Sequence, residues 1–475
     1  MASAEARPLA QSGGLADVLR ALPDALARRG HPVRRFLPAY GTIDRAGFTP
    51  ESPDLSVPLG AAHLPARFLS RREASGVVTT LVENQELFGR DGLYGPPGSE
   101  YPDNARRFAF FARAVYEWAR RRQRGPDIFH VHDWQAALIP LFCRFLGGEK
   151  PAPRTLLTIH NLGYQGQFGA AELDHLSFPE TVRREVFRVE GLEFYGGVNF
   201  LKAGIVYADA LTTVSPTYAK EILTPEFGCG LDGLLRWQIP KLHGILNGAD
   251  YELWDPSGDA ALPQPYGPNS LERKSASTAA LRERFGLPPA DRPVLGVVSR
   301  LVTQKGIDLV AEAAEDLLQA GADLVILGSG EPAIVDRLEQ LRAGHLQRIA
   351  LYIGYHEALS HLVVAGSDLL LIPSRYEPCG LTQMYAMRYG TLPVVSRTGG
   401  LADTVCDASD TDAGTGFFLE NFSAGALTHA IRRALDLRRA DPGAWKRLQL
   451  KAMAADFSWD AAASRYSDLY RQIQS

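Results

Sequence analysis

The second half of the chain alternates short apolar runs with longer amphipathic segments. The apolar runs are rich in Val, Ile and Leu and predict buried strands over 294–299, 323–328, 349–354, 368–373 and 392–397. The segments between them repeat apolar residues at the helical period and predict helices over 306–321, 331–344, 357–366 and 381–390. Continuous apolar strands that alternate with helices indicate a parallel sheet covered on both faces. The pattern predicts a doubly wound α/β domain.

The first half repeats this alternation less regularly. Strands that end in polar residues are predicted over 77–84, 127–134, 154–162 and 210–215, and helices over 13–30, 103–122 and around 202–210. We therefore expect two Rossmann-like doubly wound α/β domains that face one another across a deep cleft. The predicted domains are 1–241, completed by a C-terminal helix over 457–475, and 242–456. The segment 247–270 is rich in turn residues and is predicted to be a loop.

The first eleven residues, MASAEARPLAQ, contain no run of about five apolar residues that could form a central parallel strand. Either the first sheet lacks a strand or the translation start lies upstream. An empty position inside a sheet would leave backbone groups unpaired. We therefore expect an upstream start.

Composition excludes several classes of protein. With 475 residues the chain is too long for one core, and its net charge of −4 gives no electrostatic reason to expect nucleic acid or an anionic membrane as a partner. The four cysteines lie far apart, which argues against a disulfide framework or a zinc site and fits a reducing cytoplasm. No apolar run is long enough for a signal peptide or a membrane helix.

Two segments of the second half suit an anionic ligand. Arg300 follows a predicted strand and Lys305 precedes a helix, so both could neutralise a diphosphate; the alternative is a solvated surface pair. In SRYEPCGLTQMYAM, Glu377 follows a strand, and the backbone N–H groups of Gly380, Leu381 and Thr382 open the next helix. A carboxylate beside a diphosphate would have to bind hydroxyl groups, as on a sugar; the alternative is that Glu377 caps the helix.

Other polar and aromatic residues follow strands as well. His160 is either a catalytic residue or a packed structural histidine, and His132 with Asp133 form either ligands or a satisfied loop pair. A metal site of His130, His132 and His160 is a weak alternative, because no carboxylates stand at ligand-like spacing. Tyr355 could stack on a nucleobase or belong to the core. Together these features favour a nucleotide-sugar glycosyltransferase without a metal or a redox cofactor.

The chain resembles the bacterial glycogen synthases and plant starch synthases over nearly its whole length, from about Ser3 to Tyr470. The segments that carry the resemblance, in order, are SGGLADV, PDNARRFAFF, HDW, TIHNLGYQG, LKAGIVYADALTTVSPTYAKEI, GILNGADYELWDP, SRLVTQKGIDL, SRYEPCGLTQMYAMRYGTLPVV and RTGGLADTV. The resemblance implies a cytoplasmic enzyme of the GT-B type. Such an enzyme transfers glucose from ADP-glucose to the non-reducing end of an α-1,4-glucan, with retention and without metal or cofactor.

The resemblance also implies roles for individual residues. Arg300 and Lys305 would neutralise the diphosphate, Glu377 would hold glucose hydroxyls, and His160 would lie beside the anomeric carbon. The implied donor-binding residues are Gln11, Gly13, Gly14, Asn247, Tyr355, Gly380, Leu381 and Thr382. Asp17 and Asp133 are expected on the acceptor side. Domain closure would exclude water, so that glucan is the acceptor.

The loop AQSGGLADVL departs from the family pattern. The family has Lys-x-Gly-Gly-Leu here, with the lysine on the donor phosphates, whereas this chain has Gln11. Losing one charge-assisted hydrogen bond should cost about 1.5–3 kcal/mol, or roughly ten- to a hundredfold in rate, so we expect a weakened site. A catalytically weakened glucan- or nucleotide-binding homologue is therefore the alternative function. A hydrolase would need a second carboxylate beside Glu377, and a phosphorylase would need a lysine-bound pyridoxal phosphate.

Overall fold

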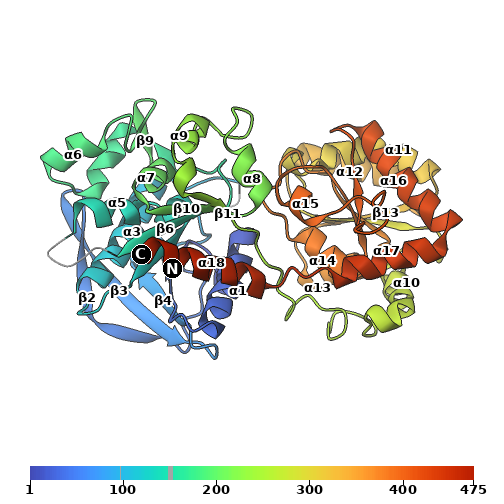
Figure 1. Cartoon of the computed structure of the whole chain (residues 1–475), viewed down its shortest axis with the longest axis horizontal. Helices are drawn as coiled ribbons and strands as arrows, with labels where there is room; N and C mark the ends of the chain where they lie inside the picture. Colours follow the sequence, from blue (N-terminus) through green and yellow to red (C-terminus); the bar gives the residue numbers. More distant parts are fainter. Residues whose placement is uncertain (97, 148–152) are drawn as a thin grey trace. The chain divides into compact units, whose positions relative to one another are not determined.

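The computed structural model describes residues 1–96, 98–147 and 153–475 and divides them into two compact units (Figure 1). Unit 1 comprises Met1–Gly248 and Trp459–Ser475, and unit 2 comprises Ala249–Ser458. Residues 242–248 belong to unit 1, contrary to the predicted boundary, because strand β11 (Leu242–Gly244) pairs with β10 (Ala210–Thr213) in its sheet. The last helix, α18 (Trp459–Gln474), packs against α1 (Gly14–Arg28) of the same unit. The expected cleft stays a prediction.

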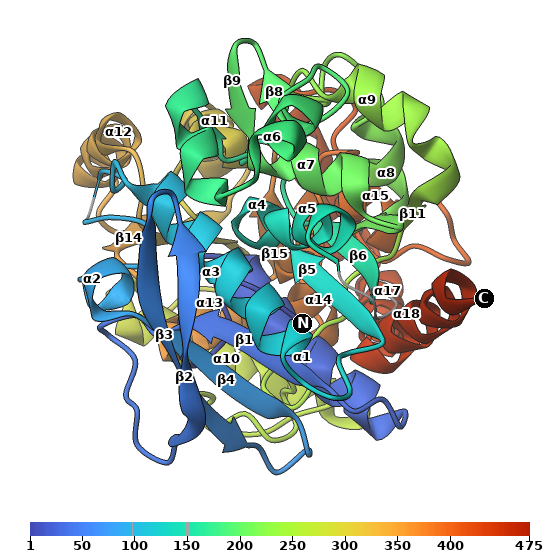
Figure 2. The ribbon, with the colours of Figure 1, turned by 90° about the vertical axis from the view of Figure 1, so that its left-hand side faces the viewer.

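Unit 1 is built on two groups of four strands. One group runs in the order β1 (Arg34–Pro38), β4 (Val78–Glu83), β3 (Ala62–Arg72) and β2 (Thr49–Leu59). The other runs β11, β10, β6 (Arg154–Ile159) and β5 (Ile128–His132) and is parallel throughout. Figure 2 shows the long antiparallel β2–β3 hairpin beside β4. The pattern missed this hairpin and β1, because β2 carries three prolines and mostly exposed side chains.

The first three residues join these two groups of strands. Ala2 pairs in parallel with Phe36 of β1 on one side and with Val131 of β5 on the other. Its N–H donates to the His130 carbonyl over 3.0 Å, and its carbonyl accepts from the His132 N–H over 3.1 Å. The prediction that the first eleven residues contribute no strand to this sheet is therefore wrong, because Met1–Ser3 fills the position between β1 and β5. Ala2 and Ser3 are fully buried, and their short side chains fit a crowded position that a search for β-branched runs overlooks.

Helices cover the sheet of unit 1, and a small antiparallel sheet lies apart from it. The remaining helices of this unit are α2 (Gln85–Phe88), α3 (Asn104–Arg120), α4 (Asp133–Ala136), α5 (Leu138–Phe145), α6 (Glu180–Val186), α7 (Phe200–Tyr207), α8 (Pro216–Glu221) and α9 (Asp232–Trp237). The small sheet contains β7 (Gln167–Phe168), β9 (Gly197–Asn199) and β8 (Glu193–Phe194). The three predicted helices correspond to α1, α3 and α7.

Unit 2 has one parallel sheet, as predicted, made of the five predicted strands and a sixth, β17, that the pattern missed. Its strands are β12 (Val294–Val298), β13 (Asp323–Gly328), β14 (Ile349–Ile353), β15 (Leu369–Ile372), β16 (Leu392–Val395) and β17 (Phe417–Phe418), in the spatial order β14-β13-β12-β15-β16-β17. This is the doubly wound order, in which the direction of progression reverses between β12 and β15. Ligands of such sheets bind at the carboxyl ends of the strands beside that reversal. The loops after β12 and β15 are therefore the place to look for a site.

The helices of unit 2 cover this sheet. They are α10 (Lys274–Arg284), α11 (Ile307–Gln319), α12 (Pro332–Gly344), α13 (Glu357–Gly366), α14 (Thr382–Arg388), α15 (Gly399–Thr404), α16 (Ala424–Ala440) and α17 (Pro442–Ala454). One part of the core joins α10 and α13 to the sheet through Leu281, Val325 and Val363, all fully buried. Of the predicted loop 247–270, residues 250–266 form no helix or strand, whereas a 3₁₀ helix begins at Pro268. Trp254 anchors this loop by stacking on Tyr385 at 4.3 Å and on His361 at 3.7 Å.

Candidate active site

The loops that follow β12 and β15 are bound to one another. The Arg375 N–H donates to the Gln304 carbonyl over 2.9 Å, and the Gln304 side chain donates to the Tyr376 carbonyl over 3.3 Å. Gly306 ends the first loop with a φ of 68°, and a Cβ there would lie 1.9 Å from the Pro373 carbonyl oxygen. Only glycine allows this close approach. The two loops thus form one rigid surface at the reversal of the strand order.

Two cations predicted for an anionic ligand lie on this surface in different states. Arg300 is exposed, and its guanidinium donates to the Gln304 side chain over 3.2 Å. Lys305 is 19% exposed, and its Nζ lies 2.5 Å from Oε2 of Glu377, whose side chain is 8% exposed. Ser374 Oγ donates to the same carboxylate oxygen over 3.0 Å. Lys305 is thus not a solvated surface residue, since the fold pairs it with a buried carboxylate.

Glu377 does not cap the following helix. The N-cap residue of α14 is Leu381, and no side chain caps it. Gly380 precedes it with a φ of 69°, so the chain turns sharply before the helix begins at Thr382. Gly399 closes the other side, where a Cβ would lie 1.9 Å from the Glu377 carbonyl oxygen. The fold itself requires glycine at Gly399, and the left-handed backbone favours glycine at Gly380.

Tyr355 follows β14, the edge strand of the same sheet. Its side chain is 65% exposed, which excludes the core alternative. A flat ring that is exposed at the carboxyl edge of a nucleotide-type sheet can stack on a base.

In unit 1, the structure brings His160 and Asp133 together at the ends of β6 and β5. The His160 backbone N–H donates to Asp133 Oδ1 over 2.7 Å. Asp133 is 9% exposed and has a φ of 53°, a left-handed conformation that Asp and Asn tolerate better than most residues. Burial raises the pKa of the Asp133 carboxyl to about 7, although the N–H groups of His160 and Asn161 favour its charged form. At neutral pH this carboxyl is close to its titration midpoint.

The side chain of His160 is bound to a second histidine. His160 Nε2 and His132 Nδ1 lie 3.0 Å apart, and burial lowers the pKa of His160 to about 3. His130 is bound elsewhere, to Tyr470 and Thr158. Over the described ranges, no group of three His, Cys, Asp or Glu side chains is placed to hold a metal ion. The three histidines therefore form hydrogen-bonded rings and not a ligand set.

The glycine turn before α1 is held by a carboxylate that the sequence analysis missed. The Glu5 carboxylate accepts from the N–H of Ser12 over 2.7 Å and from that of Gly13 over 3.1 Å. Tyr94 donates its hydroxyl to the other Glu5 oxygen over 2.7 Å. The Gly13 amide, which was expected to face a ligand, is thus occupied. Gln11 is exposed beside them.

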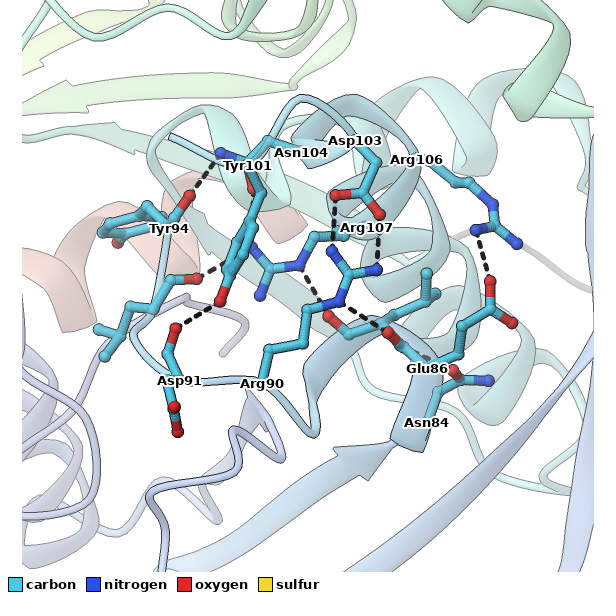
Figure 3. Close-up of polar contacts among 12 residues, drawn as sticks. Asn84, Glu86, Arg90, Asp91, Tyr94, Tyr101, Asp103, Asn104, Arg106 and Arg107 are labelled. Carbon is cyan, nitrogen blue, oxygen red and sulfur yellow. Dashed lines mark hydrogen bonds and ion pairs between the residues drawn. The ribbon is translucent and has the colours of Figure 1, made fainter. Parts of the chain in front are cut away.

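The loop that carries Tyr94 is fixed by Arg107 (Figure 3). The Arg107 side chain is fully buried and donates to the Leu87 carbonyl over 2.7 Å and to the Leu93 carbonyl over 3.0 Å. Asn104 adds a bond to the Tyr94 carbonyl over 2.9 Å. These residues come from the segment PDNARRFAFF, whose sequence gave no role. The sequence could have indicated this role, because the segment places an Asn and an Arg one helical turn apart on α3.

Asp17 and Asn247 are two further predicted site residues of unit 1. Asp17, in the first turn of α1, forms an ion pair with Arg7 at 2.9 Å. Asn247 is 6% exposed, and its Oδ1 has no hydrogen-bond partner among the described residues. A buried acceptor without a donor is uncommon and suits a ligand that supplies one. Throughout the described part of the chain, every helix is too short or too polar to cross a membrane.

Comparison with known proteins agrees with the resemblance. Residues 1–237 match the family model described as the starch synthase catalytic domain, and residues 281–448 match that of glycosyl transferases group 1. A glycogen synthase of Anaeromyxobacter dehalogenans is 47% identical over 99% of this chain and 98% of its own length. Glycogen synthase 1 of Rhizobium meliloti is 45% identical with the same coverage.

Solved structures give the same result. The catalytic domain of starch synthase IV from Arabidopsis thaliana, bound to ADP and acarbose, superposes with a TM-score of 0.92 at 34% identity, covering 100% of this chain and 98% of that one. A sucrose-phosphate synthase from Thermosynechococcus elongatus shares the fold alone, with a TM-score of 0.60 at 20% identity. The chain therefore belongs to the glycogen synthase and starch synthase family, whose members are two-domain α/β glycosyltransferases of the GT-B type.

Proposed function

We propose that this chain transfers glucose from ADP-glucose to the non-reducing end of an α-1,4-glucan, with retention of configuration, in the cytoplasm. The observation that carries the proposal is the cationic surface at the reversal of the unit 2 sheet. Arg300 stands there on the loop after β12, and Lys305 is paired with the buried carboxylate of Glu377. The starch synthase IV catalytic domain was solved with ADP and acarbose, a nucleotide and a glucan analogue. Relatives that match the whole chain are glycogen synthases, which favours a synthase over a weakened homologue.

The diphosphate is the group that the two cations suit. As the glucosyl–phosphate bond breaks, negative charge accumulates on the leaving diphosphate, and preorganised cations stabilise that charge. Lys305 is already fixed by Glu377, whose carboxylate also accepts from Ser374, so little reorganisation is needed. Glu377 accepts hydroxyl donors from the glucose, and the N–H groups of Gly380, Leu381 and Thr382 bind the distal phosphate. Tyr355 stacks on the adenine.

Unit 1 supplies the remaining contacts to the sugar in this proposal. His160 lies beside the anomeric carbon, and its main-chain carbonyl stabilises the oxocarbenium-like state. Asp133 and Asp17 contact the glucan acceptor. Asn247 contributes an unpaired Oδ1 that can accept from a donor hydroxyl.

The glycine turn supports a ligand contact independently. A Cβ at Gly13 or Gly14 would meet nothing within 4 Å, and neither residue has a positive φ. The fold therefore does not require these glycines, in contrast to Gly306 and Gly399. A ligand that approaches the backbone closely would require them. The donor phosphate is the ligand proposed here, with Gln11 supplying an amide in place of the family's lysine.

The test is transfer of radiolabelled glucose to glycogen, with ADP-glucose and UDP-glucose run in parallel on the full chain. We expect label in the polymer from ADP-glucose, released by an enzyme that cleaves α-1,4 linkages. Free glucose without incorporation would indicate a hydrolase. No turnover of either donor by a cooperatively folded chain would contradict the proposal.

A further inference from the structure

A histidine of unit 1 that the proposed reaction does not use holds the ring of His160. His132 lies at the end of β5, and its side chain is fully buried. Its Nδ1 is 3.0 Å from His160 Nε2. Its other nitrogen, Nε2, is buried without any hydrogen-bond partner among the described residues. His132 therefore makes one polar contact with its ring, and that contact is to the proposed catalytic residue.

The neighbouring His130 shows that a buried ring here can be fully satisfied. Its Nδ1 lies 2.7 Å from the Tyr470 hydroxyl of α18, and its Nε2 lies 2.6 Å from Thr158 Oγ1. His130 and His132 are two residues apart on one strand, so they lie on the same face. Their ring centroids are 4.2 Å apart. An Nε2 without a partner is thus found on the His132 ring and not on that of His130. It determines which nitrogens of His132 and His160 carry the ring protons.

Two arrangements of protons are compatible with the 3.0 Å contact between two neutral rings. Burial holds the pKa of His132 well below its usual value and that of His160 at about 3, so both are neutral at pH 7. If His160 donates from Nε2, the proton of His132 must be on its own Nε2, as a buried N–H without an acceptor. If His132 donates from Nδ1, only a lone pair is left without a partner. Buried N–H groups without partners are the rarer case, which favours the second arrangement.

We infer that His132 is a positioning residue that donates from Nδ1 and thereby keeps the proton of His160 on its Nδ1. The tautomer of a histidine is set by the bond that its other nitrogen makes. In this tautomer Nδ1 of His160 is a hydrogen-bond donor, suited to a hydroxyl oxygen of the glucosyl group. The assignment of a glucosyl hydroxyl as the hydrogen-bond partner of His160 rests on the proposed function. The inference about the tautomer does not.

The direct test is the nitrogen spectrum of histidine-labelled full-length chain. Long-range proton–nitrogen correlations distinguish a protonated ring nitrogen from a bare one, and His160→Asn assigns the His160 signals by their loss. We expect His160 protonated at Nδ1 and bare at Nε2, and His132 protonated at Nδ1. A proton on His160 Nε2 overturns the inference. This measurement needs no turnover, so it is decided even if the chain transfers no glucose.

Two substitutions of His132 test the consequence for transfer. In His132→Asn the amide nitrogen takes the place of Nδ1 and keeps a donor, whereas His132→Leu removes it. We expect kcat within about threefold of the native value for Asn and a fall of roughly 10- to 100-fold for Leu, with KM for ADP-glucose nearly unchanged. His130→Leu is the matched control for loss of a buried ring in the same strand. If thermal melting shows that the Asn and Leu variants are both folded, equal kcat values for the two would also overturn the inference.

Discussion

The carboxyl edges of the two sheets differ in the charge of their polar residues. In unit 2, Arg300 is exposed, and Lys305 forms a fixed ion pair with Glu377. In unit 1, Asp133 and the rings of His132 and His160 are held mainly by one another. Burial holds both of these rings neutral at pH 7 and keeps the Asp133 carboxyl near its midpoint.

This difference matches the chemistry proposed for each unit. A diphosphate carries full charges, and fixed cations are the groups that stabilise it. A glucan carries only hydroxyl groups, which neutral donors and acceptors bind without a large cost of desolvating ions. The main contacts to the diphosphate and to the glucan thus fall on different sheets because the residues that follow their strands differ in charge state, and the glycine turn of unit 1 adds a contact to the donor phosphate.

Removing the cation of unit 2 should have the largest effect. Lys305→Ala deletes the charge from the phosphate surface and leaves Glu377 buried without its partner. We expect kcat/KM for ADP-glucose to fall roughly 10³-fold. Lys446→Ala, an exposed lysine on α17, is the control and should keep native activity. A Lys305→Ala enzyme within threefold of native would refute the role of this ion pair.

Adding a cation to unit 1 should have the next largest effect. Gln11→Lys restores the charge that the family places at this turn, at an exposed position that accepts a longer side chain. We expect kcat/KM to rise roughly ten- to a hundredfold, corresponding to about 1.5–3 kcal/mol. Gln11→Met, similar in length but neutral, should not raise it. Equal rates for the native chain and Gln11→Lys would mean that the glutamine costs nothing.

Making the buried carboxyl of unit 1 neutral should stabilise the protein while it lowers activity. The folded pKa of Asp133 is about 7, above its unfolded value, so native stability falls as pH rises from about 4 to 7. Asp133→Asn keeps an oxygen for the His160 N–H and suits the left-handed backbone. We expect it to raise the free energy of unfolding by roughly 1–3 kcal/mol at pH 8, with the gain vanishing near pH 4. Denaturant unfolding at both pH values checks this, and a constant difference would contradict it.

The smallest effect concerns a buried cation of unit 2 away from the site. Lys274 donates to Thr391 Oγ1 over 2.6 Å, and burial lowers its pKa to about 7. Since the unfolded chain binds the proton up to about pH 10, stability should rise with pH between 7 and 10. Lys274→Met should flatten this rise by about 1–2 kcal/mol between pH 7.5 and 9.5, as measured by denaturant unfolding. An unchanged slope would show that Lys274 is charged in the fold.

The sequence predicted unit 2 better than unit 1 for a physical reason. Strands buried on both faces, such as β13, are apolar throughout and stand out in the sequence. The exposed β2 lacks that signature because most of its side chains are polar or prolines. The bridging segment Met1–Ser3 lacks it because its buried residues, Ala2 and Ser3, have very small side chains. Pattern alone therefore missed β1, the β2–β3 hairpin and the bridging segment Met1–Ser3.

The same limit applies to the candidate site. His160, Arg300, Tyr355 and Glu377 were named from their positions after strands, which is where the structure has them. Their hydrogen-bond and ion-pair partners could not be named from the sequence, because Lys305 and Glu377 are 72 residues apart and Glu5 lies outside any recognisable strand or helix. Pairing across such separations is set by tertiary packing, which local pattern does not encode.

The most direct test of the division between the two units is amide hydrogen exchange on the full chain with each ligand separately. The account predicts that ADP slows exchange most strongly in 299–307 and 376–384 of unit 2. It predicts that maltoheptaose slows exchange in 130–136 and 158–166 of unit 1. Protection by ADP confined to unit 1, with the loops after β12 and β15 unchanged, would contradict the assignment of the nucleotide to the cationic edge.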